Sequence, residues 1–293
     1  MPSLLERLGL GQQAAVGPAS GAAWVRRYSM PTTPLLERET IVYMRSVRTG
    51  SEVYLIGTAH VSKASAEEVK EVIHLVRPQY VGVELDAERA EKLMSGKMYE
   101  DQGSRGLLAT LRELMHAPGD IGQKVLTVAM RSMYKMLRDT GLEPGLEFKV
   151  AMEEAQKVNA EIVLLDRPAQ ETMARLREVL SLWDIVKLFT RRIDPNEVPP
   201  VLRDMGQITP QNIEETTEQL KTREAVRQIT AFMEKLFPDV VRVMVHERDE
   251  IIFNRLRQLR GCIVAVVGMA HVDGIERLWK EYEDYGVDEV EEF

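Results

Sequence analysis

One short phrase occurs twice in the chain and constrains its fold more than any other feature. The first copy, residues 53–61, reads Val-Tyr-Leu-Ile-Gly-Thr-Ala-His-Val, and the second, residues 264–272, reads Val-Ala-Val-Val-Gly-Met-Ala-His-Val. Each copy is a continuous apolar run, which is typical of a buried strand, followed by a glycine that allows the chain to turn. The repeat therefore predicts two buried strands, each followed by a histidine, His60 and His271.

Other segments complete strand–helix units around this repeat. Residues 40–47 and 53–56 have the pattern of a β-hairpin with its turn at Gly50, and residues 65–76 have helical spacing. Further strands are predicted at 80–85 and 161–165, and a short edge strand at 287–290. We expect an α/β (α+β) fold whose central mixed, partly parallel sheet has two halves, each bearing a Gly-x-x-His motif.

The remaining segments divide the chain into a leader and one domain with insertions. Residues 1–34 are small, aperiodic and poor in acidic side chains, which predicts a flexible leader. Residues 35–293 form the predicted domain, with helical insertions at about 86–140 and 171–257 that make a large cap.

Composition excludes several classes of protein. The net charge of −8 argues against a general nucleic-acid binder, so no nucleic-acid partner is expected. The single Cys262 cannot form an intramolecular disulfide, which fits an intracellular, reducing compartment. It lies in an apolar run and is predicted to be buried. The chain contains no apolar run of the roughly 18 to 20 residues that a membrane span needs.

Polar residues follow the ends of four predicted strands: His60, Glu84, the pair Asp166-Arg167, and His271. In α/β sheets, ligands and catalytic groups gather at the carboxyl ends of the strands. Two histidines with carboxylates form the ligand set of a hydrolytic metal centre, in which a carboxylate acts as general base. Arg167 or Arg248 would then stabilise an oxyanion or orient a substrate carboxylate. No nucleophile elbow, Walker loop or His-Glu-x-x-His helix is present.

At this point the sequence resembles the TraB/PrgY family, over about residues 41–290. Each motif is short, but the ordered set is specific. The matching motifs are Gly57-Thr-Ala-His60, Glu84-Leu85, Gly145-x-Glu147-Phe148, Leu165-Asp166-Arg167, Glu247-Arg248-Asp249 and Gly268-Met-Ala-His271-Val-x-Gly274. The family is grouped with the TIKI metalloproteases, the GumN proteins, the erythromycin esterases and the haem-binding ChaN proteins.

The resemblance implies a metal-dependent hydrolase, peptidase-like or esterase-like, with a peptide or small-molecule substrate. The ion would be divalent, with manganese, cobalt and zinc left open. Members in eukaryotes are associated with mitochondria or other membranes, so the expected location is cytoplasmic or mitochondrion-associated. Prokaryotic relatives continue into membrane-spanning helices, which this chain does not show. The resemblance assigns His60, His271, Glu84 and Glu147 to the metal, and Glu84, Arg167, Glu247 and Arg248 to catalysis.

Simpler interpretations stay open beside this one. Glu147 and Glu247 also suit helix-surface charges, Arg167 suits a structural partner of Asp166 or Glu84, and Asp86 suits a helix N-cap. Two other functions remain as alternatives: a haem- or ligand-binding protein, and a non-catalytic regulatory protein peripherally associated with a membrane. Helical stripes at 107–137 and 220–237 suit either the core or a homodimer face.

Overall fold

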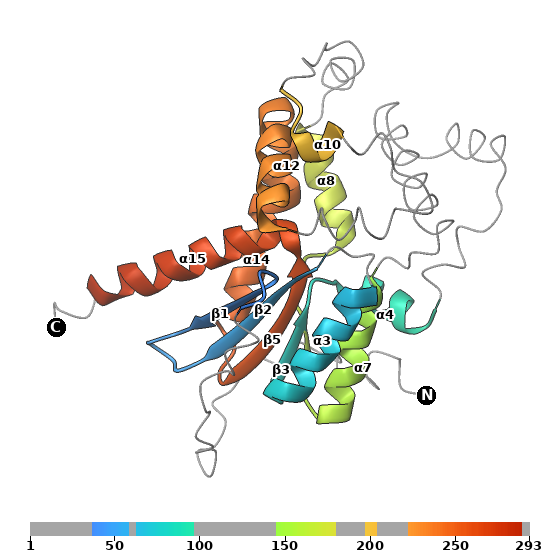
Figure 1. Ribbon diagram of the computed structural model, residues 1–293, viewed down its shortest axis with the longest axis vertical. Coiled ribbons are helices and arrows are strands. Elements are labelled where there is room, and N and C mark those ends of the chain that lie inside the picture. The colour runs from blue at the N-terminus through green and yellow to red at the C-terminus, as the bar shows by residue number, and fades with distance from the viewer. Residues whose placement is uncertain (1–36, 59–62, 97–144, 180–196, 204–221, 289–293) are drawn as a thin grey trace.

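The strands form one mixed sheet. The computed structural model describes residues 37–58, 63–96, 145–179, 197–203 and 222–288. The sheet has five strands in the order β1-β2-β5-β3-β4 (Figure 1). β1 (Ile41–Arg45) is antiparallel to β2 (Glu52–Thr58), whereas β5 (Cys262–Gly268), β3 (Tyr80–Val83) and β4 (Glu161–Leu164) continue parallel to β2. This sheet and its flanking helices confirm the predicted α/β fold class.

The two copies of the repeated phrase lie side by side at the centre of the sheet. β2 and β5 pair in parallel, and the register places Thr58 opposite Gly268. A Cβ atom added to Gly57 would lie 2.7 Å from side-chain atoms of Met269 and of Val272. The glycine of the first motif therefore leaves the space into which the second motif packs. His60 lies outside the described residues.

Helices cover both faces of the sheet. On one face, α3 (Lys63–Val76) and α7 (Leu146–Val158) pack with α4 (Ala87–Met94), and on the other α14 (Glu247–Leu256) packs with α15 (Met269–Asp288) (Figure 1). Successive residues of β5 alternate between these two cores, and all seven are buried. A strand covered on both faces needs apolar residues at every position, which explains its continuous apolar run. Cys262 is buried, as predicted.

A group of helices stands beyond one end of the sheet. α8 (Ala169–Val179), α10 (Pro200–Arg203) and α12 (Arg223–Leu236) rise above the upper end of β5 (Figure 1). α13 (Pro238–Val241) and a π-helical turn (Arg242–His246) then lead into α14. All of these elements come from residues 169–256, between β4 and β5.

The structure confirms the predicted hairpin and corrects the predicted edge strand. The hairpin is confirmed, and Gly50 adopts the left-handed backbone with φ of 70°. The predicted edge strand at 287–290 is wrong at its start, because α15 continues to Asp288. Valine alone is a weak signal for a strand, and the preceding helix overrides it. The predicted leader, residues 1–34, and the stripe at 107–137 lie outside the described residues.

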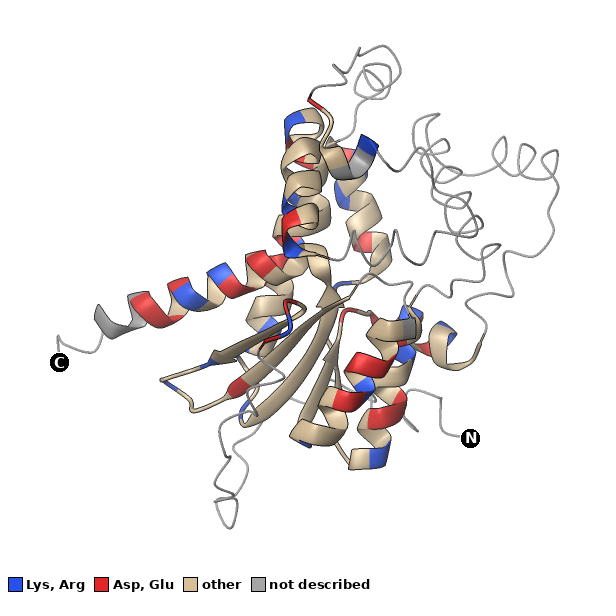
Figure 2. Cartoon of the chain, viewed as in Figure 1, with Lys and Arg blue, Asp and Glu red and all other residues tan. Residues whose placement is uncertain are grey.

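Charged side chains are concentrated on the helices. Figure 2 shows acidic and basic residues along α3, α7, α12 and α15, whereas the strands carry few. Within the described ranges, no helix combines the length and apolar character that crossing a membrane requires.

Candidate functional site

Glu84 follows β3 at the carboxyl end of the parallel strands. The residue is only 4% exposed, and its backbone N–H donates to the carbonyl of Val266 in β5. The N–H of Gly268 donates to Oε2 of Glu84 over 2.6 Å. Gly268 immediately precedes α15, and the amino-terminal end of a helix stabilises a nearby negative charge. The sheet and the start of α15 therefore fix this carboxylate in place.

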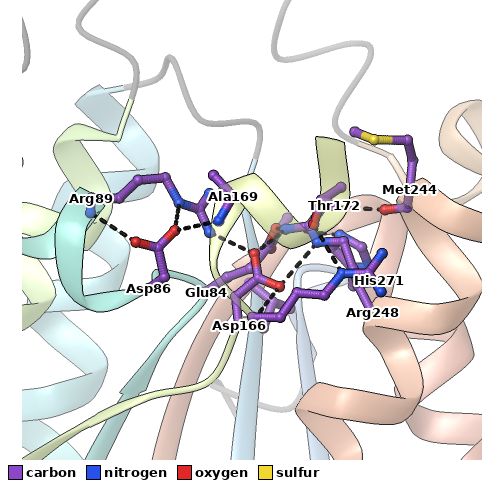
Figure 3. Close-up of polar contacts among 12 residues, drawn as sticks. Glu84, Asp86, Arg89, Asp166, Ala169, Thr172, Met244, Arg248 and His271 are labelled. Atoms are coloured by element: carbon purple, nitrogen blue, oxygen red, sulfur yellow. Dashed lines mark hydrogen bonds and ion pairs between the residues drawn. The ribbon is translucent and has the colours of Figure 1, made fainter. Parts of the chain in front are cut away.

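His271 lies in the first turn of α15, between two carboxylates. Its Nε2 is 3.3 Å from Oε1 of Glu84, and its Nδ1 is 2.6 Å from Oδ1 of Asp249 in α14. The imidazole ring is buried, with His271 only 4% exposed. Three separate segments of the chain thus meet at one ring, two of which carry the labelled Glu84 and His271 in Figure 3.

The surroundings of His271 favour its charged form. Burial lowers the pKa of the ring, but the charge of Glu84 and the hydrogen bonds to Asp249 and Glu84 outweigh burial and raise the pKa of His271 to about 9. The two carboxylates therefore favour the imidazolium form of the ring over the neutral form.

Two arginines connect further carboxylates to this centre. Arg248 hydrogen-bonds to Glu84 and also to both oxygens of Asp166, over 3.1 and 2.7 Å. Arg89 donates to Asp166 and to Asp86, over 2.6 Å in each case (Figure 3). The result is a chain of alternating charge, buried except for the partly exposed Arg89, that runs in the order Asp86, Arg89, Asp166, Arg248, Glu84, His271 and Asp249.

Asp166-Arg167 and Glu247-Arg248 pair crosswise. Asp166 binds Arg248, while Arg167 donates to Oε2 of Glu247 over 2.9 Å. The alternative in which Arg167 pairs with Asp166 or Glu84 gives way to this ion pair with Glu247, although the backbone N–H of Arg167 does donate to Asp166 over 2.9 Å. These crossed pairs join the end of β4 to the start of α14. Arg175 of α8 also donates to Glu247.

The π-helical turn before α14 supplies acceptors for both arginines of the crossed pairs. The carbonyl of Val243 accepts from Arg167 over 2.9 Å, and that of Met244 accepts from Arg248 over 3.1 Å. A wide turn disrupts the regular helical ladder and frees carbonyls for such contacts. The sequence of this turn does not predict its π-helical geometry.

The three other acidic residues considered from the sequence differ in burial and in role. Glu147, in the first turn of α7, is fully buried and accepts from Oγ1 of Thr58 over 3.4 Å, so it is not a helix-surface charge. Thr58 ends β2, which places Glu147 at the same edge of the sheet. Glu247 is partly exposed. Asp86 caps α4 as predicted, by accepting from the N–H of Arg89.

Asp249 is a functional candidate that the sequence pattern does not single out. It appeared only as the last residue of the Glu247-Arg248-Asp249 motif. Asp249 lies in the first turn of α14, before β5, and His271 lies in the first turn of α15, after β5. Only the packing of α14 against α15 brings them together.

We predict that the protein becomes less stable as pH rises. The raised pKa of His271 means that its contribution is complete below about pH 6.5, the ordinary value, and is lost as pH passes about 9. The shift corresponds to roughly 3 kcal/mol. Urea unfolding in EDTA between pH 6.5 and 9.5 measures the change, and His271→Gln should remove this part of the slope. Equal slopes in the two proteins would contradict the prediction.

Arg248→Ala should lower the free energy of unfolding by about 3–5 kcal/mol, because it leaves the buried Glu84 and Asp166 without their shared cation. Arg227→Ala is the control, since its exposed ion pair with Asp273 should contribute less than about 1 kcal/mol. Denaturant unfolding at neutral pH measures both variants. A loss for Arg248→Ala no larger than that of the control would show that the chain of charges contributes little.

Comparison with known proteins places the chain in a family. It is 29% identical over 252 residues to an uncharacterised protein of Methanocaldococcus jannaschii, which covers 83% of this chain and 58% of the relative. It is 30% identical over 261 residues to the TraB domain-containing proteins of mouse and human, covering 82% of this chain and 65% of each relative. The chain thus spans less than two thirds of these relatives. A sequence model of the TraB/PrgY/gumN family matches residues 44–288, and the chain belongs to that family.

Proposed function

We propose that this chain is a metal-dependent hydrolase of peptide or related acyl bonds, with His271 and Glu84 at its reactive centre. The observation that carries the proposal is the buried imidazole of His271 held between Asp249 and Glu84 at the carboxyl ends of the strands. That edge is the usual place of ligand sites in α/β sheets. The alternating charges around it keep the polar groups fixed in a buried setting, where electrostatic effects on a substrate are strong.

The donor chemistry of this pair fits a divalent ion. Two ligands of a tetrahedral ion, each about 2.1 Å from the metal, lie about 3.4 Å apart. The separation of Nε2 of His271 and Oε1 of Glu84 is 3.3 Å. Among the described residues no cluster of three or more histidine, cysteine or acidic side chains forms a complete site. The proposed set therefore adds His60, which follows Thr58 by two residues, and Glu147, which contacts Thr58.

A bound divalent ion supplies a water of lowered pKa and polarises the substrate carbonyl. The chain itself contributes the groups around that water. Glu84, whose Oε2 accepts from the N–H of Gly268, faces Nε2 of His271 with Oε1, and its carboxylate would accept the proton of that water. Arg248 holds Glu84 in its orientation. Arg175 is partly exposed and lies next to Glu247, where it can bind a carboxylate of the substrate.

The alternatives place different demands on the same site. A haem-binding site needs an apolar slot beside an axial histidine. The described neighbours of both His271 nitrogens are carboxylates, which favours hydrolysis over haem binding. A non-catalytic regulatory role would instead require partner binding that survives loss of His271. Since the chain covers only part of its relatives, the substrate and partners of the whole protein are part of this proposal.

The test is cleavage of pooled fluorogenic peptides and esters by protein loaded with manganese, cobalt or zinc. Glu84→Gln and His271→Gln should each lower the rate by at least about a hundredfold, as expected for loss of a general base or a metal ligand. EDTA should abolish turnover, and the same ion should restore it. Glu234→Gln, a substitution of an exposed residue on α12, is the control.

Either of two results would contradict the proposal. Turnover that persists in both variants or in EDTA would exclude this centre. Absence of turnover with every ion and pool, together with Soret absorbance after haem addition, would favour the haem-binding alternative.

A further inference from the structure

Asp249 lies unusually close to the ring of His271 for a residue from another helix. Oδ1 of Asp249 is 2.6 Å from Nδ1 of His271, and the carboxylate is 1% exposed. Its second oxygen, Oδ2, is also buried and has no hydrogen-bond partner among the residues that the structure describes. Both carboxylate oxygens of Asp249 are therefore shielded from water. Within the described residues, the one hydrogen bond of the carboxylate is to the imidazole of His271.

Gly274 makes this approach of Asp249 sterically possible. It lies three residues after His271 in α15, and thus on the same side of the helix. A Cβ atom added to Gly274 would lie 2.0 Å from Oδ2 of Asp249 and 2.6 Å from its Cγ. Any other residue would push the carboxylate away. The φ angle of Gly274 is not positive, so space rather than backbone conformation is the reason for glycine here.

We propose that Asp249 is the positioning residue of His271, and that Gly274 sets the distance between them. By accepting the proton on Nδ1, Asp249 fixes both the rotation of the ring and the nitrogen that faces Glu84. Nε2 is then the nitrogen presented to the proposed ion. Carboxylates that bind the second nitrogen of a metal-bound histidine act in this way. Asp249 contacts the ring nitrogen opposite the one that faces Glu84, so it acts through His271.

A purely structural role of Asp249, as counter-charge to a buried imidazolium, makes a different prediction. Removing a counter-charge changes stability without changing which nitrogen faces the ion. Asp249→Asn keeps the size of the side chain but offers an amide that donates to Nδ1 and so moves the ring proton to Nε2. The wrong tautomer then opposes metal binding, as a matching Asp→Asn change in serine proteases opposes catalysis.

The first measurement is cobalt affinity by competition with a chelating dye. Asp249→Asn and Gly274→Ala should each weaken binding of Co²⁺ by about 10- to 100-fold. The double variant should bind no more weakly than Asp249→Asn alone, because both changes break the same contact. Glu250→Gln, at the exposed neighbouring position in α14, is the matched control and should bind cobalt like the unchanged protein.

The second measurement is made on the same proteins in EDTA. The short contact with Asp249 should give the Nδ1 proton of His271 a low-field proton resonance, which is lost in Asp249→Asn and displaced in Gly274→Ala. Helix propensity favours alanine over glycine, so a melting temperature of Gly274→Ala below that of the unchanged protein would report the clash with Asp249.

These two readouts separate this inference from the proposed function on which its metal step rests. If the unchanged protein binds no cobalt, the proposed metal centre is wrong, whereas the positioning contact is still judged by the ring proton. Unchanged cobalt affinity in Asp249→Asn overturns the positioning role. A wild-type ring signal with an unchanged or raised melting temperature in Gly274→Ala overturns the role of Gly274.

Discussion

The buried carboxylate of Glu84 imposes the main constraint on the site. Removing a charged group from water costs several kcal/mol unless partners replace the lost hydration. Glu84 obtains those partners from the N–H of Gly268, the guanidinium group of Arg248 and the ring of His271. Each partner comes from a segment distant in sequence. The partners of one carboxylate at the end of β3 therefore tie α14 and α15 to the sheet, beside the apolar core that these helices share with it.

The need of every buried charge for a partner also explains the ion pairs beyond Glu84. Arg248 is itself buried and needs more than one carboxylate, which Asp166 provides. The neighbouring Arg167 and Glu247 then form an ion pair with each other. Each charge of Asp166-Arg167 is thus neutralised by the opposite charge of Glu247-Arg248. A network in which every member has a partner is rigid, and rigidity of this kind is what a preorganised site requires.

The sequence predicted the features that depend on local pattern. The apolar runs predicted the strands, and Gly50 marked the hairpin turn. The repeated phrase predicted two buried strands, but only the structure shows that β2 and β5 are neighbours. The contacts between distant helices were not predictable. Asp249 meets His271 only through the packing of α14 on α15, and Gly274 has no local signal that it makes room for Asp249. The sequence left the partner of Arg167 open, because a list of charged residues does not determine which of them form ion pairs, and the structure pairs it with Glu247.

The most direct measurement of the account is anomalous diffraction from crystals of the protein grown with cobalt or zinc. We expect one strong peak about 2.0–2.2 Å from Nε2 of His271, with Glu84 beside it and His60 completing the site. A structure with full-occupancy metal elsewhere, or with no peak at His271 under saturating metal, would contradict the central claim that this histidine is the core of a metal-dependent hydrolase.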